Sequence, residues 1–269
     1  MRNVSLIGYG AIGSAIVDLW PRHLADSTAL SSLLVRPAQL AEAKARAPDG
    51  AFVTADPQAF VASAADVVIE AAGHQAVYEL GEAVLRRGAV FQILSAGALA
   101  DTDLRRRLDM AASAGGGRTV ILAGALAGFD GLLSLRAAGL RSVSYTSVKP
   151  CEAWRDTAGE PLLPPPGDMT PRTIFRGSAA EVCRAFPKNA NLAAAVALAG
   201  AGFEATRVEL VADPRATQNS GRLQAASEAG DLDVTLVGEG FRENPKTSRI
   251  TALSVIATLR DAAERIGFH

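Results

Sequence analysis

The sequence predicts an α/β protein, in which a doubly wound parallel sheet is followed by a second α+β domain built on a mainly antiparallel sheet. The first observation is an apolar run, Val4 to Ile7, that leads into three glycines at Gly-x-Gly-x-x-Gly spacing. The second is the alternation of strand-like and helical segments up to Gly124. The third is the change beyond Gly124 to short runs in which apolar and polar residues alternate, as in half-buried strands.

The first domain, residues 1–124, is expected to hold six parallel strands joined by crossover helices, which is a Rossmann-type arrangement. The strands are expected at residues 4–7, 30–35, 52–54, 66–71, 90–95 and 119–122. Helical spacing of apolar residues follows the three glycines, and Pro21 is expected to end that helix. Further helices are expected at residues 74–87 and 101–114.

The second domain, residues 125–244, is expected to form the antiparallel sheet, with a hairpin turn at Gly230-Asp231. Its strands are expected at residues 143–149, 173–177, 207–212, 223–227 and 234–237, and its helices at 179–186 and 191–201. The proline-rich residues 161–171 indicate a loop. Because these helices cover one face of the sheet, the other face is either exposed or paired with a second subunit, and we expect a homodimer.

A final helix, residues 245–269, is expected to complete the first domain. Asn244 would cap this helix and Pro245 would take its first position, and an apolar stripe from Leu253 to Ile266 follows. The second domain would then be an insertion between the sixth strand and this helix.

Composition narrows the classes of function. The 269 residues are 49% hydrophobic, and 27 Lys and Arg balance 28 Asp and Glu, which argues against nucleic acid or an anionic membrane as the main partner. No run approaches the ~20 apolar residues of a spanning helix. The two cysteines, Cys151 and Cys183, are far apart, so neither a disulfide framework nor a metal site is indicated. We expect a cytoplasmic protein with a small-molecule ligand.

The three glycines indicate a dinucleotide site. Gly8 permits a tight turn, Gly10 lets a pyrophosphate approach the backbone, and Gly13 lets the helix pack on its strand. The phosphates would meet the backbone N–H groups of Ala11 and Ile12 at the helix start. The expected cofactor is NAD or NADP, and the alternative is an ordinary strand–turn–helix corner.

Two strand ends of the first domain carry further candidates for cofactor binding. The second strand ends at Arg36, where a carboxylate normally binds the adenine ribose of NAD; an arginine instead suits the 2′-phosphate of NADP, or is a solvated surface residue. The fourth strand exits through Ala72, Gly73 and His74, whose small residues let a nicotinamide ring approach. His74 is a candidate for proton transfer or a helix-capping or buried histidine.

Candidate substrate-binding residues lie in the second domain. Lys188, Asn189 and Asn191 precede a helix that one asparagine is expected to cap, and their amides and ammonium group suit a carboxamide and a carboxylate. Arg222 is a candidate carboxylate ligand, as is Arg176, although a surface position is the default for either arginine. Thr247, at the expected start of the final helix, is a candidate anion ligand or a plain cap.

The chain resembles the L-aspartate dehydrogenase family in seven motifs that occur in order along nearly its whole length. The motifs are Gly8-x-Gly10-x-x-Gly13, Ala72-Gly73-His74-Gln75-Ala76, Ser95-x-Gly97-Ala98-Leu99, Gly124-Ala125-Leu126-x-Gly128-x-Asp130, Phe175-x-Gly177-Ser178-Ala179, Pro187-Lys188-Asn189-x-Asn191 and Asn244-Pro245-Lys246-Thr247-Ser248. The resemblance implies a two-domain, usually dimeric cytoplasmic oxidoreductase that uses NAD or NADP. It implies oxidation of L-aspartate through iminosuccinate to oxaloacetate and ammonia, or supply of the imine to pyridine nucleotide biosynthesis. It also makes Ala125 and Asn191 cofactor contacts.

The chain departs from the family at one position. Members typically read Asn-x-His where this chain has Asn219-Ser220-Gly221, and that histidine is the family's catalytic residue. Glycine has no side chain to transfer a proton. Three hypotheses follow: His74, Lys188 or a held water replaces the base; the pocket admits another substrate, giving an amino-acid dehydrogenase or imine reductase of shifted specificity; or the chain binds nucleotide without turnover.

Overall fold

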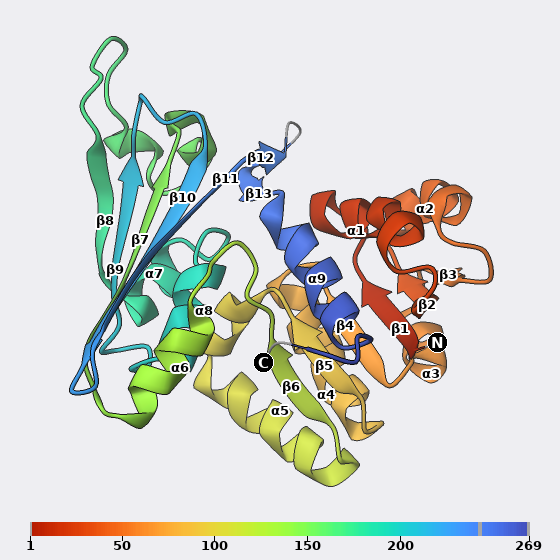
Figure 1. Ribbon diagram of the computed structural model, residues 1–269. Helices are drawn as coiled ribbons and strands as arrows, with labels where there is room; N and C mark the ends of the chain where they lie inside the picture. Colours follow the sequence, from red (N-terminus) through yellow and green to blue (C-terminus); the bar gives the residue numbers. More distant parts are fainter. Residues whose placement is uncertain (1, 242–243, 268–269) are drawn as a thin grey trace. The chain divides into compact units, whose positions relative to one another are not determined.

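The computed structural model describes residues 2–241 and 244–267, with the backbone alone for residues 244–246. The chain forms two compact units (Figure 1). Unit 1 contains the residues up to Gly124 and those from Thr251 onward, and unit 2 contains residues 125–250. Among the described helices, none combines the length and the apolar character needed to cross a bilayer.

Unit 1 is built on a six-stranded sheet in the order β3-β2-β1-β4-β5-β6, with every pair parallel. Its strands are β1 (Arg2–Ile7), β2 (Thr28–Leu34), β3 (Phe52–Thr54), β4 (Val67–Glu70), β5 (Val90–Ile93) and β6 (Arg118–Ile121). This sheet confirms the predicted doubly wound arrangement. The strand order reverses between β1 and β4, where Ile7 pairs with Glu70, and ligands of such sheets bind at this point.

The strands of unit 1 are connected by helices and short 3-10 turns. These are α1 (Ala11–His23), η1 (Pro37–Gln39), α2 (Leu40–Arg46), α3 (Pro57–Ser63), α4 (His74–Arg86), η2 (Ala96–Ala100) and α5 (Thr102–Gly115). The expectation that Pro21 ends α1 is wrong, because the helix continues to His23. A proline so near the end of a helix removes a single intrahelical hydrogen bond, and the helix tolerates it there.

Unit 2 is built on a five-stranded sheet in the order β11-β10-β7-β9-β8. Its strands are β7 (Leu140–Lys149), β8 (Arg172–Ser178), β9 (Arg207–Ala212), β10 (Asn219–Ser227) and β11 (Asp231–Gly238). Only β7 and β9 pair in parallel, so the sheet is mainly antiparallel, as predicted. The helices α6 (Phe129–Ala137), α7 (Ala179–Ala185) and α8 (Asn191–Ala199) contact the sheet or one another.

Two further segments of unit 2 differ from a plain sheet. The turns η3 (Cys151–Trp154) and η4 (Glu160–Leu162) lie in the connection from β7 to β8. A short hairpin pairs β12 (Gly240–Phe241) with β13 (Asn244–Ser248).

The hairpin corrects the prediction of a helix from residue 245, because α9 runs from Ile250 to Asp261. An Asn-Pro pair also suits a short edge strand, where the missing proline N–H costs no ladder bond. The oxygen of Ser248 accepts a hydrogen bond from the N–H of Ile250 at 3.3 Å, next to the start of α9.

Candidate functional site

The glycine turn after β1 is shaped by close packing at two of its three glycines. Gly8 has φ +106°, and a Cβ there would lie 2.8 Å from the carbonyl oxygen of Ala71 and from the Cα and Cβ of Ala72. A Cβ on Gly13 would lie 2.1 Å from the carbonyl oxygen of Gly8. Both glycines are therefore required by the fold itself, since any side chain would push α1 and the β4 exit away from the turn.

Gly10 is a glycine for a different reason. It is exposed at the N-cap of α1 with φ −80°, and an added Cβ would meet no atom within 4 Å. It offers no side-chain cap to the N–H groups of the first turn, which begins at Ala11 and Ile12. Neither backbone strain nor packing demands glycine here. The open space before a helix N-terminus fits the diphosphate of a dinucleotide.

Glu70, the last residue of β4, organises the neighbouring strand exits. Its side chain is fully buried. Its Oε1 accepts hydrogen bonds from the N–H groups of Ala72 at 2.8 Å and Gly73 at 2.7 Å and from the Ser95 hydroxyl at 2.9 Å. Its Oε2 accepts from the Ser95 N–H at 3.0 Å. Burial raises the pKa of Glu70 above its ordinary value, against the opposing effect of these hydrogen bonds. Sequence reasoning gave Glu70 no role, although a carboxylate ending an apolar strand before two small residues was a usable signal.

Arg36 is exposed just beyond β2. Its Nε donates to Oε1 of Gln39 at 3.2 Å, and Nε2 of Gln39 donates to the carbonyl oxygen of Tyr9 at 2.7 Å. Gln39 thus connects the arginine to the glycine turn. This geometry keeps a guanidinium group beside the turn, where it suits a phosphate better than a ribose hydroxyl.

The remaining predicted residues are spread over both units. His74 is the first residue of α4 and is half-buried in unit 1, while Ala125 is half-buried in unit 2. Lys188 is exposed in unit 2. Asn189 is half-buried, and its Nδ2 is a buried atom with no hydrogen-bond partner among the described residues.

The predicted asparagine cap is wrong. Ala190 is the N-cap of α8 and makes no side-chain cap hydrogen bond, and Asn191 is the first helical residue. Neither Asn189 nor Asn191 therefore stands at the N-cap position of α8. Nδ2 of Asn189, which is buried and has no hydrogen-bond partner among the described residues, remains a candidate donor to a ligand.

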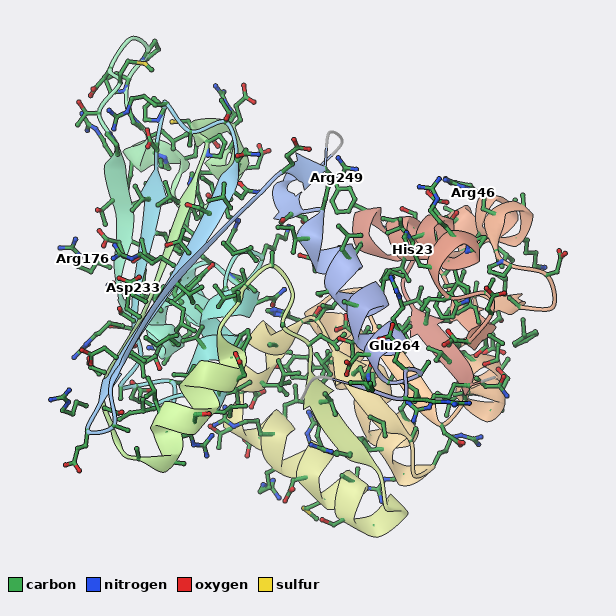
Figure 2. All side chains as sticks on the ribbon, in the orientation of Figure 1. His23, Arg46, Arg176, Asp233, Arg249 and Glu264 are labelled. Atoms are coloured by element: carbon green, nitrogen blue, oxygen red, sulfur yellow. The ribbon has the colours of Figure 1, made fainter. Side chains whose placement is uncertain are left out.

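Arg222 and Arg176 lie on the exposed surface of the five-stranded sheet and pair with carboxylates there. Arg222 donates through Nε to Oδ1 of Asp233 at 2.8 Å, and Arg176 contacts Oε1 of Glu209 at 2.6 Å (Figure 2 labels Arg176 and Asp233). Neighbouring side chains of a strand point to opposite faces, so Arg222 faces away from the buried side of Gly221. We leave both arginines out of the proposed site.

The structure does not support Thr247 as an anion ligand at a helix start. It lies in β13 rather than at a helix start, because α9 begins at Ile250. A strand has no helix dipole to attract an anion.

Gly221 lies in β10, an inner strand of the unit 2 sheet, opposite Ser147 of β7. A Cβ at this position would lie 3.2 Å from both Cε2 and the hydroxyl oxygen of Tyr145 and 3.3 Å from Cδ1 of Leu126. Burial raises the pKa of Tyr145 to about 12, although a hydrogen bond with Ser147 lowers it. The family's histidine is absent here, but the space directly above the glycine is not open, because other side chains fill it. The tyrosine that fills it stays protonated at neutral pH.

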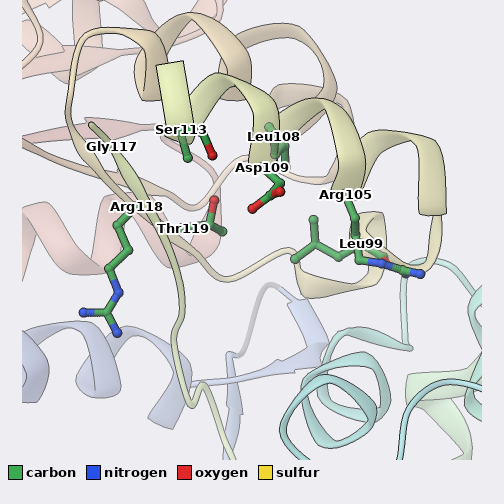
Figure 3. Close-up of a pocket in the computed structure, with 9 residues that line it drawn as sticks. Leu99, Arg105, Leu108, Asp109, Ser113, Gly117, Arg118 and Thr119 are labelled. Atoms are coloured by element: carbon green, nitrogen blue, oxygen red, sulfur yellow. The ribbon is translucent and has the colours of Figure 1, made fainter. Parts of the chain in front are cut away.

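A pocket of about 510 Å³ lies in unit 1 between α5 and β6 (Figure 3). It is lined by residues such as Leu108, Asp109 and Arg118, and none of its lining residues is a predicted site residue. Among the described residues, no group of three or more His, Cys, Asp or Glu side chains is arranged to hold a metal ion.

Comparisons with known proteins agree with this fold. Residues 8–122 match the family described as "Homoserine dehydrogenase, NAD binding domain", and residues 130–262 match "Aspartate dehydrogenase, C-terminal". The chain is 39% identical to the L-aspartate dehydrogenase of Serratia proteamaculans, with 97% of each chain covered. It is 42% identical to L-aspartate dehydrogenase 2 of Bordetella bronchiseptica, with 96% of each covered.

A solved structure shares the fold over the full length. The aspartate dehydrogenase of Thermotoga maritima matches 100% of both chains with a TM-score of 0.75 at 24% identity. The doubly wound sheet, the glycine turn and these relatives together define an NAD(P)-dependent oxidoreductase that acts on an amino acid. The chain belongs to the L-aspartate dehydrogenase family.

Proposed function

We propose that this protein oxidises L-aspartate to iminosuccinate, which water converts to oxaloacetate and ammonia, and that it does so as a cytoplasmic homodimer. The observation that carries the cofactor half of the proposal is Gly10, whose open surroundings and negative φ leave a bound diphosphate as the reason for a glycine. The full-length similarity to L-aspartate dehydrogenases supports the substrate.

A bound nicotinamide cofactor would supply the hydride acceptor for the α-carbon of the amino acid. The backbone N–H groups of Ala11 and Ile12, next to Gly10, hold its diphosphate. Ala72, Gly73 and His74 contact its nicotinamide half in this proposal. The resemblance to the family also gives Ala125 and Asn191 as cofactor contacts. Arg36 binds a 2′-phosphate when the cofactor is NADP.

Lys188 and Asn189 bind the carboxylates of aspartate in this proposal. The ammonium group of Lys188 is exposed, so it can approach an anion without a burial cost. The buried Nδ2 of Asn189 is a donor for which the described residues supply no acceptor, and a buried donor of this kind is costly unless something pairs with it.

Proton transfer is the step that the change at Gly221 affects. The ammonium group of aspartate has to lose a proton, and water has to be activated to hydrolyse the imine. The hydroxyl of Tyr145 lies at Gly221, but its pKa of about 12 prevents it from serving as a base at neutral pH. His74 and Lys188 remain the proposed substitutes, and we expect a slow turnover. Because Tyr145 and Leu126 close the space above Gly221, the structure offers no support for a larger substrate at this position.

The test is a direct assay of the purified protein. The absorbance of reduced nicotinamide is followed with L-aspartate, with other amino acids, and in reverse with oxaloacetate and ammonia. We expect the fastest change with aspartate and its keto acid. Turnover of another amino acid alone would replace aspartate as the substrate, and cofactor binding without any turnover would contradict the enzymatic proposal. Analytical ultracentrifugation tests the dimer, and cell fractionation tests the compartment.

A further inference from the structure

Glu70 is a buried carboxylate that accepts four hydrogen bonds within the described part of the chain, all of them from uncharged donors. The donors are the N–H groups of Ala72, Gly73 and Ser95 and the hydroxyl of Ser95. Burying a carboxylate is unfavourable unless such bonds compensate for the lost water. An apolar side chain here would leave the N–H groups of Ala72, Gly73 and Ser95 without their acceptor, so these strand exits depend on Glu70.

The donors belong to two loops that are adjacent in space but distant in sequence. Ala72 and Gly73 follow β4, and Ser95 follows β5, the neighbouring strand. Ala72 also lies against the glycine turn, because a Cβ on Gly8 would touch it at 2.8 Å. One side chain thus fixes two strand exits at the carboxyl edge of the sheet, and one of those exits adjoins the phosphate-binding turn.

The pattern of donors specifies the ionised acid. A neutral glutamine accepts through one oxygen only, so its NH2 group would face either the Ser95 N–H or the three donors that now meet Oε1. A protonated carboxyl group could direct its own O–H only toward the Ser95 hydroxyl oxygen, because the other three partners are N–H groups. The carboxylate accepts from all four donors at once.

We propose that Glu70 is a positioning residue for the nicotinamide half of the cofactor, acting through the backbone of the β4 and β5 exits that it holds together. The inference rests on the proposed dinucleotide site. Glu70 itself does not touch the cofactor in this proposal. Its role is to set the position of Ala72 and Gly73, which make that contact; among the described residues, Glu70 has no hydrogen bond with Ala11 or Ile12, whose N–H groups hold the diphosphate.

The test compares two ligands in Glu70→Gln and the unchanged protein. ADP-ribose contains the adenine and diphosphate portions but lacks nicotinamide, whereas NADH contains all of them. Binding of each is measured by calorimetry. We expect the dissociation constant of NADH to rise about tenfold in Glu70→Gln, because a displaced β4 exit fits the nicotinamide half less well, with that of ADP-ribose changed less than about twofold.

The matched control is Glu209→Gln, which also removes a hydrogen-bonded carboxylate but lies in β9 of unit 2. It should change neither affinity. An equal loss of both ligands in Glu70→Gln, or no loss of either, overturns the positioning role. If that variant does not fold, Ser95→Ala removes the hydroxyl bond alone and should weaken NADH selectively by a smaller factor; no selective loss there also overturns the inference. Failure of the unchanged protein to bind either ligand overturns the proposed function instead.

Discussion

Gly10 in unit 1 and Gly221 in unit 2 both lack a side chain, but their surroundings are opposite. An added Cβ would meet nothing within 4 Å at Gly10, whereas at Gly221 it would meet Tyr145 and Leu126 at 3.2 to 3.3 Å. The space beside Gly10 is open, whereas the side chains of Tyr145 and Leu126 fill the space beside Gly221. A glycine in a functional motif is therefore evidence for a ligand only where the structure leaves the space beside it empty.

The largest expected effect comes from filling the empty space. Gly10→Val should keep the fold, since φ is −80° and nothing lies within 4 Å of the new Cβ. It should raise the dissociation constants of NADH and ADP-ribose by about 100-fold or more, through loss of two or more hydrogen bonds to a charged diphosphate. Calorimetry measures the affinities and thermal melting checks the fold. Gly10→Ala should give a smaller loss, and unchanged affinity in both variants would refute the phosphate site.

The second largest effect is expected from placing a histidine side chain at Gly221. Gly221→His should raise the rate of aspartate oxidation about tenfold or more, because an imidazole can transfer protons near neutral pH. The gain is limited by Tyr145 and Leu126, which have to move, at a cost of about 1–3 kcal/mol in stability. Initial rates with aspartate across pH measure the effect.

The double variant Gly221→His with Tyr145→Phe sharpens this test. It removes the hydroxyl oxygen that lies 3.2 Å from the new Cβ, so it should recover stability and retain the gain in rate. No gain in either variant would show that aspartate does not react at this position.

A third prediction concerns the other edge of the cofactor site. Arg36→Ala should weaken NADPH binding about tenfold and NADH binding less than about threefold, since a charge-assisted contact with the 2′-phosphate is lost. Arg118→Ala, an exposed arginine at the start of β6, is the control and should change neither. A parallel loss of both cofactors would assign Arg36 to the adenine ring or the fold instead.

The smallest predicted effect concerns helix α5. A side chain caps the first N–H groups of this helix, whereas at Gly10 the first N–H groups of α1 have no side-chain cap. Asp101 caps α5, and its carboxylate accepts from the N–H groups of Asp103 and Leu104. Its hydrogen bond with the Leu104 N–H is the main cause that lowers its pKa below the ordinary value of 3.8. Asp101→Ala should lower the free energy of unfolding by about 1 kcal/mol at neutral pH.

The pH dependence of that difference has a defined sign. Because the folded state lowers the pKa of Asp101, its charge stabilises the protein above about pH 3.8 and ceases to do so as the pH falls through the lower folded-state value. Urea unfolding at a series of pH values measures this. Asp101→Asn keeps a capping oxygen without a charge, so its stability should lack this pH-dependent component; the same pH dependence in that variant would contradict the assignment.

Much of the fold was predictable because its signals are local. The buried strands of unit 1 read as apolar runs, and Asp101 and Ser178 precede their helices as ordinary caps. Helix α6 was not predicted, because it begins after Gly128 with φ +85° and contains Gly131, both of which resemble loop residues in sequence. Asn244-Pro245 was assigned to a helix start because the same pair suits either a cap or an edge strand.

The candidate site was less predictable, because its contacts join residues that are far apart in sequence. Glu70 and Ser95 are 25 positions apart, and only the pairing of β4 with β5 brings them together. Arg222 and Asp233 are 11 positions apart across a hairpin, so the ion pair that removes Arg222 from the site depends on the strand register. Tyr145 fills the space beside Gly221, and this contact likewise depends on which side chains share a face of the sheet.

The position of α9 has a consequence for how the protein is made. This helix belongs to unit 1, yet the ribosome synthesises it only after all of unit 2. Val255, Ile256 and Leu259 of α9 are buried in the finished protein, so the nascent dinucleotide domain waits with an incomplete core until they emerge. Unit 2, by contrast, is one continuous segment, so all of its residues have emerged before the last part of unit 1 is made.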